Sequence, residues 1–134
     1  MDATIHDALD HSQMIDLTTT GRRTGQPRRI EIVLHSIDGR LLISGMPHRR
    51  TRAWIHNLEA DPRLIVHLKQ GVHANVEGTA RVVTDPEERR ELLVGIARAW
   101  NRTDVERMVA ESPLIELTIP GYAAAATSAA AGPS

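Results

Sequence analysis

The stretch DLTTTGRRTGQPRR, Asp16–Arg29, joins two extended segments and carries a strong turn signal between them. β-Branched residues dominate the run before the turn, Met14–Thr20, and apolar residues alternate with polar ones in the run after it, Arg28–Ile37. Two glycines and a proline separate the runs. They favour a chain reversal, because glycine adopts backbone conformations that other residues avoid and proline fixes its own backbone. The sequence therefore predicts a strand, a loop and a second strand.

The same loop concentrates positive charge. Its four arginines are Arg22, Arg23, Arg28 and Arg29. A guanidinium group donates two parallel hydrogen bonds to a phosphate or a carboxylate, and a glycine-rich loop exposes backbone N–H groups that bind anions as well. The loop therefore predicts an anion-binding site. A solvated basic turn is the alternative and carries about equal weight.

Turn, strand and helix signals alternate along the rest of the chain. Further strands are predicted over Arg40–Met46, Arg63–Lys69, Val72–Val83 and Leu114–Ile119. Helices are predicted over Thr51–Ala60 and after the capping residues Asp85 and Asp104. The Asp38-Gly39 pair predicts a hairpin turn, and Gly78 predicts a bulge or bend within the long strand.

Six strands with helices inserted between them at irregular intervals predict a mainly β fold with helices (α+β), a small antiparallel barrel. A β-sandwich is the weaker alternative. The length of 134 residues corresponds to one domain. We expect an N-terminal arm or short helix over 1–13, a single barrel domain over 14–119 and a disordered tail over 120–134. The tail is rich in Ala, Gly and Ser and has little to bury.

The composition excludes several classes of protein. The net charge is −1, and two tryptophans, one tyrosine and no phenylalanine leave few surfaces for base stacking, so a nucleic-acid partner is not expected. The absence of cysteine excludes a disulfide scaffold and thiolate chemistry. No apolar run approaches the ~20 residues of a membrane span, and no signal-peptide apolar region is present. We therefore expect a soluble, cytoplasmic protein.

No set of catalytic or metal-binding side chains stands out. The histidines lie on separate segments without metal-ligand spacing, so surface or pocket-wall histidines are favoured over metal ligands at His35, His48, His56, His67 and His73. The serines lack a nucleophile elbow, and the glycine loop has neither the Walker nor the Rossmann pattern. Such a chain fits either a binding module or an enzyme whose cofactor supplies the chemistry.

Two motifs resemble one known family. LTTTGRRTGQPR (Leu17–Arg28) and AWIHNLEADP (Ala53–Pro62) are similar to the deazaflavin-dependent nitroreductases of actinobacteria, and the resemblance extends over about residues 15–119. These are split β-barrel proteins of the flavin-reductase and pyridoxamine-phosphate-oxidase-like type that use coenzyme F420. The resemblance implies an F420-dependent oxidoreductase that transfers a hydride from the reduced deazaflavin to an electron-poor small molecule, such as a quinone, an enone or a nitro compound. It favours F420 over FMN and leaves a homodimer open.

The resemblance also implies the residues that bind the cofactor. Residues that contact the phosphate and acidic tail of the coenzyme correspond to Arg22, Arg23, Thr24, Gly25, Gln26, Pro27 and Arg28. Ser44 matches a serine beside the deazaflavin ring, and the helix near the ring is matched by Ala53, Trp54 and Asn57. A plain core tryptophan is an equal alternative for Trp54. No catalytic side chain and no metal are implied.

The chain departs from the family pattern near the predicted ring site. Ser44-Gly45-Met46-Pro47 stands in place of Ser-x-Gly-Gly, Arg52 in place of a proline, and Ile55 in place of a tyrosine. Residues 89–109 also lack the tyrosines that hold substrate in the well-studied nitroreductases. Cofactor binding is therefore better supported than nitroreductase activity. The alternatives are a carrier that holds F420, FMN, haem or a fatty acid in the same barrel pocket, and a structural domain that forms oligomers.

Overall fold

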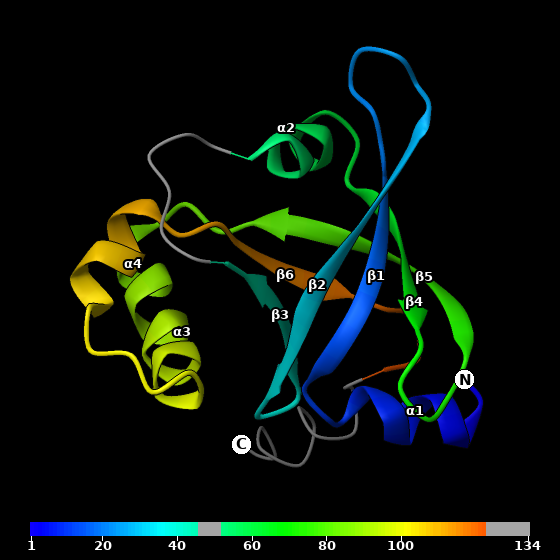
Figure 1. The fold of residues 1–134 in the computed structure, drawn as a ribbon, viewed down its shortest axis with the longest axis horizontal. Helices are drawn as coiled ribbons and strands as arrows, with labels where there is room; N and C mark the ends of the chain where they lie inside the picture. Colours follow the sequence, from blue (N-terminus) through cyan, green and yellow to red (C-terminus); the bar gives the residue numbers. More distant parts are fainter. Residues whose placement is uncertain (46–51, 123–134) are drawn as a thin grey trace.

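A computed structural model describes residues 1–45 and 52–122 of the chain. Within these ranges six antiparallel strands close into a barrel in the order β1-β2-β3-β6-β5-β4, and four helices lie outside it (Figure 1). The strands are β1 (Gln13–Thr20), β2 (Pro27–Ile37), β3 (Arg40–Ser44), β4 (Arg63–Leu68), β5 (Ala74–Val82) and β6 (Leu114–Thr118). The helices are α1 (Ala3–Leu9), α2 (Ala53–Ala60), α3 (Pro86–Ala99) and α4 (Val105–Glu111). The mainly β fold with helices is confirmed, and closure of the barrel decides against a sandwich.

Apolar side chains on the inner face of the strands fill the inside of the barrel. In β1 the side chains of Ile15, Leu17 and Thr19 are buried, whereas the residues between them are only partly covered. The other strands contribute to the same core, which includes Leu34, Leu41, Ile43, Val66 and Ile115. Burial of apolar surface drives this packing at roughly 25 cal/mol per Å².

Helices α3 and α4 form a second core on the outside of the barrel. Buried side chains of this core are Leu42, Val83, Leu92, Leu93, Ile96, Ala97, Met108 and Leu114. Figure 1 shows the two helices packed together on one side of the barrel. The predicted start of α3 is confirmed, since the Asp85 side chain accepts a hydrogen bond from the Glu88 N–H at 2.9 Å. In the described part of the chain, no helix is both long and apolar enough to cross a bilayer.

The predicted bulge at Gly78 is absent. The register between β4 and β5 continues without interruption through the Leu64–Gly78 pair. A Cβ atom at Gly78 would lie only 2.9 Å from the carbonyl oxygen of Thr118. The glycine is therefore needed for the close approach of β6.

Ordered packing continues past the predicted end of the barrel at residue 119. Tyr122 is only 8% exposed, and its hydroxyl lies 2.7 Å from Oδ1 of Asp10 and 3.1 Å from the carbonyl oxygen of Leu9. This contact connects the C-terminal segment to the end of α1. The rest of the predicted tail, residues 123–134, lies outside the described residues.

Two histidines are buried, so the prediction of surface or pocket-wall histidines is wrong for them. His35 is 2% exposed and packs edge-on against Trp100, at the end of α3, with ring centroids 4.8 Å apart. Its Nε2 has no hydrogen-bond partner among the described residues. His67 lies between Thr18 Oγ1 and Asn75 Oδ1, each 2.7 Å from one ring nitrogen. Groups from other parts of the chain cover both rings. The alternation of residues along a single strand does not indicate these groups, so the burial of the two histidines was not predicted.

The burial of His35 predicts a pH-dependent stability. Desolvation holds the pKa of His35 below its ordinary value of 6.5, so the unfolded chain binds this proton more readily. The contribution of neutral His35 to the free energy of unfolding is complete above pH 6.5 and falls as the pH drops from there toward the folded pKa. In urea denaturation at about pH 7.5 and about pH 5.5, we expect a smaller acid-induced loss in His35→Leu than in the wild type. An equal loss in both would contradict the assignment.

Candidate functional site

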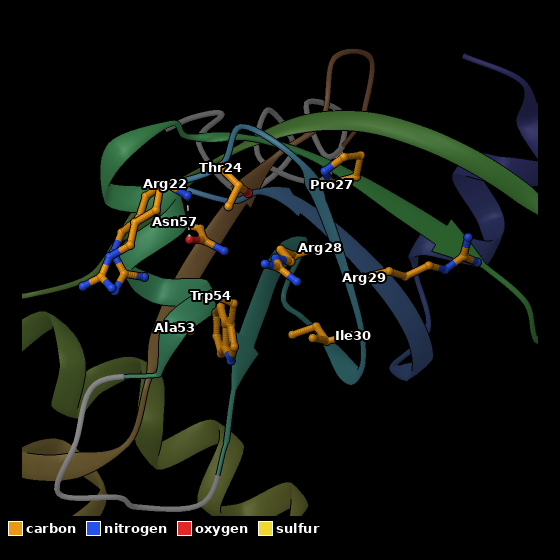
Figure 2. A pocket seen from close by; sticks show the side chains of 10 residues that line it. Arg22, Thr24, Pro27, Arg28, Arg29, Ile30, Ala53, Trp54 and Asn57 are labelled. Carbon is orange, nitrogen blue, oxygen red and sulfur yellow. Dashed lines mark hydrogen bonds between the residues drawn. The ribbon is translucent and has the colours of Figure 1, made fainter.

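A groove of about 600 Å³ opens between the β1–β2 turn and helix α2 (Figure 2). Its lining residues come from the two sequence motifs: Arg22, Arg23, Thr24, Pro27, Arg28, Arg29, Ile30, Ala53, Trp54 and Asn57. The hairpin supplies a basic wall, and α2 supplies Trp54 on the facing wall. The fold therefore brings together two segments that are far apart in the chain.

Local backbone hydrogen bonds fix the shape of residues 21–28, which we call the arginine turn. The N–H of Gly21 donates to the carbonyl of Gln26 at 2.8 Å, and the N–H of Gly25 donates to the carbonyl of Gly21 at 2.8 Å. Gly25 has a φ of +70°, which side chains disfavour. A Cβ at Gly21 would lie 2.9 Å from Thr24 Oγ1. A side chain is therefore strained at Gly25, and at Gly21 its Cβ would also lie 3.1 Å from the backbone carbonyl oxygen of Gln26.

Three guanidinium groups of the arginine turn are free to bind an anion. Arg22, Arg23 and Arg28 are exposed, and within the described parts of the chain their side chains have no hydrogen-bond or ion-pair partner. Arg29, which follows the turn, points away from it in Figure 2 and pairs with Asp16 at 3.0 Å. Other arginines are also paired with carboxylates: Arg40, Arg63, Arg81, Arg90, Arg102 and Arg107. The free groups give this groove a local positive potential.

The rest of the groove lining is mainly apolar and comes from both α2 and β2. Trp54 and Asn57 are three residues apart in α2 and therefore share one face of the helix. Figure 2 shows the indole of Trp54 beside Ile30, which follows Arg28 by two residues on the same side of β2. Trp54 also belongs to the barrel core and is 8% exposed, so it serves both the core and the groove. This wall suits a planar, apolar group attached to an anionic one.

Most of the predicted site residues meet in this groove, and three do not. Gly25 lines a second groove of about 520 Å³ beside the turn, and Gln26 is exposed without lining either groove. Ser44 is 1% exposed at the end of β3, where its hydroxyl donates to the carbonyl of Pro113 at 2.6 Å. Sequence reasoning missed Ile30 as a groove residue, although its place two residues after Arg28 on a predicted strand could have indicated it.

The six strands form a split β-barrel with a basic, partly apolar groove. A family model for the F420H(2)-dependent quinone reductases matches residues 1–119. The chain therefore belongs to this family of F420-dependent oxidoreductases, and the predicted family, enzyme class and cofactor are confirmed.

Solved structures share the fold. An F420 reductase is 16% identical with a TM-score of 0.64, over 87% of this chain and 94% of that one. The conserved hypothetical protein Rv2991 from Mycobacterium tuberculosis is 23% identical with a TM-score of 0.69, over 90% and 81%. A putative pyridoxamine 5′-phosphate oxidase from Listeria innocua is 12% identical with a TM-score of 0.63, over 87% and 91%. At these identities the likeness supports the split-barrel fold alone.

The free guanidinium groups predict a salt-sensitive loss of affinity in Arg28→Ala. Removing one charge-assisted contact, worth roughly 1.5–3 kcal/mol, should weaken binding of F420 about tenfold or more. Added salt should weaken binding in the wild type more than in the variant, because screening acts on a charge that the variant lacks. Isothermal titration at two salt concentrations measures both effects.

The matched control is Arg98→Ala, which removes the same charge from an exposed position on α3 outside the groove. It should leave the affinity and its salt dependence unchanged. Thermal unfolding should be nearly the same in both variants, since exposed substitutions change stability by about ±0.5 kcal/mol. Equal affinities in Arg28→Ala and the wild type would identify the turn as merely solvated.

Proposed function

We propose that the arginine turn and α2 together hold coenzyme F420, and that the chain uses it to reduce a small electron-poor acceptor of the quinone type. Membership of the F420H(2)-dependent quinone reductase family carries the reaction class. One observation carries the placement of the site: three free guanidinium groups line the same groove as Trp54.

The basic wall suits the anionic part of the coenzyme, its phosphodiester and polyglutamate tail. Arg22, Arg23 and Arg28 each offer a fork of donors that matches a phosphate or carboxylate. No carboxylate of the described residues competes for them. Their exposure leaves them open to an extended, flexible tail.

The apolar wall suits the ring of the coenzyme. Trp54, Ile30 and Ala53 offer a surface that excludes water from one side of a planar group. When bound in its reduced form, the coenzyme supplies the hydride. The chain then contributes orientation, and its arginines contribute a positive potential that stabilises negative charge on the acceptor. The charged side chains that line the groove are all arginines, which stay protonated, so acid–base catalysis by these groups is not part of the proposal.

A carrier that binds the coenzyme without turnover is the second candidate. It is favoured by the lack of a titrating side chain in the groove and by the absence of tyrosine from residues 89–109. Ser44, Gly25 and Gln26 stay predicted cofactor contacts outside this groove. A homodimer also stays a prediction, which sedimentation velocity measures directly.

We expect the purified protein to oxidise F420H2 in the presence of a quinone, with recovery of the absorbance of oxidised F420. Parallel titrations with F420, FMN and haem measure the cofactor preference, and F420 should bind most tightly. Tight binding of F420 without turnover on quinones, enones or nitro compounds would favour the carrier. A protein that neither binds F420 nor oxidises F420H2 would contradict both candidates.

A further inference from the structure

Asn57 joins the arginine turn to the helix that forms the facing wall. It is 5% exposed, and its Oδ1 accepts a hydrogen bond from the backbone N–H of Arg22 at 3.1 Å (dashed in Figure 2). Its Nδ2 donates to Oγ1 of Thr19 at 3.2 Å, and Thr19 is 2% exposed. One amide therefore connects α2 to Thr19, near the end of β1, and to the backbone of Arg22.

The orientation of this amide follows from its partners. The backbone N–H of Arg22 can only donate, so the oxygen of Asn57 must face it. The hydroxyl of Thr19 can accept, so it matches the remaining NH₂ group. Among the hydrogen bonds of the described residues, the Asn57–Arg22 bond is the one that joins residues 21–26 to another helix or strand. The other bonds of these residues lie within their own hairpin.

We propose that Asn57 is a positioning residue that fixes the arginine turn against α2 before the ligand arrives. The identity of the ligand, F420, rests on the proposed function above. Without the anchor, the turn samples more conformations, and binding must then order the guanidinium groups at an entropic cost. Asn57 thus acts on affinity through the backbone of Arg22.

A double-mutant cycle separates positioning from direct contact. We expect Asn57→Ala to raise the dissociation constant for F420 about tenfold in the wild-type background. In the Arg22→Ala background we expect a rise of about threefold or less, because part of the benefit of the anchor passes through the missing guanidinium. Isothermal titration of the four proteins measures this. An equal rise in both backgrounds, or no rise in either, would overturn the proposal.

Limited trypsin digestion tests the anchor without any ligand. Trypsin cleaves after arginine, and mass spectrometry reports the rate at Arg22 and Arg23 separately from other sites. We expect faster cleavage there in Asn57→Ala, and a smaller increase in Thr19→Val, which keeps the shape of the side chain but loses the acceptor of Nδ2. Tyr122→Phe is the control, because it removes the hydroxyl contacts at the other end of the barrel.

The control should lower the unfolding temperature without faster cleavage at the turn. If the turn is cleaved no faster in Asn57→Ala than in Tyr122→Phe, Asn57 is only part of the core and the proposal is wrong. Failure of the wild type to bind F420 would overturn the proposed function alone, since the digestion result on the anchor would stand.

Discussion

The site depends on the double pairing of β1, which is hydrogen-bonded to β2 on one side and to β4 on the other. Thr19 lies opposite Arg28 across one ladder and opposite Leu64 across the other. A slip of one residue would turn Ile15 and Leu17 out of the core, so burial holds the register. The register in turn fixes where the arginine turn leaves the barrel. The core thus determines the position of an exposed basic loop.

The groove is positively charged although the whole chain has a net charge of −1. The reason is that charged side chains elsewhere on the barrel are paired with side chains of opposite charge. Arg40 and Arg81 both pair with Glu116, and these hydrogen bonds hold the pKa of the Glu116 carboxyl below its ordinary value. Asp16 is likewise shared by Arg29 and Lys69, which lower its pKa. Charges on the barrel wall are therefore largely neutralised in place, whereas those of the arginine turn project into the groove. A local field of this kind attracts an anion without making the whole protein basic.

The sequence predicted the strands and helix ends that are determined by residues close together in the chain. β-Branched runs, alternation and turn signals located the strands, and Asp85 located the start of α3, because these patterns depend on neighbours in the chain. The motifs also located both walls of the groove. The burial of His35 and Tyr122 was missed, since it depends on which segments cover these positions in three dimensions. The link from Asn57 to Arg22 was missed for the same reason: a side chain of α2 meets a backbone N–H that lies 35 residues earlier.

The exposed arginines of the turn are separate from the buried residues that form the core, so the two sets of residues can change independently. The side chains of Arg22, Arg23 and Arg28 are exposed and bond to none of the described residues, so the barrel does not depend on their charge. Gly21, Gly25 and Asn57 meet geometric demands of the turn, and their replacement disturbs its shape. In the proposed site, affinity for an anion can therefore be adjusted at the arginines with little loss of stability, whereas uncharged residues hold the backbone of the turn. Under this proposal, charge sets the strength of binding and the uncharged residues set the position of the turn.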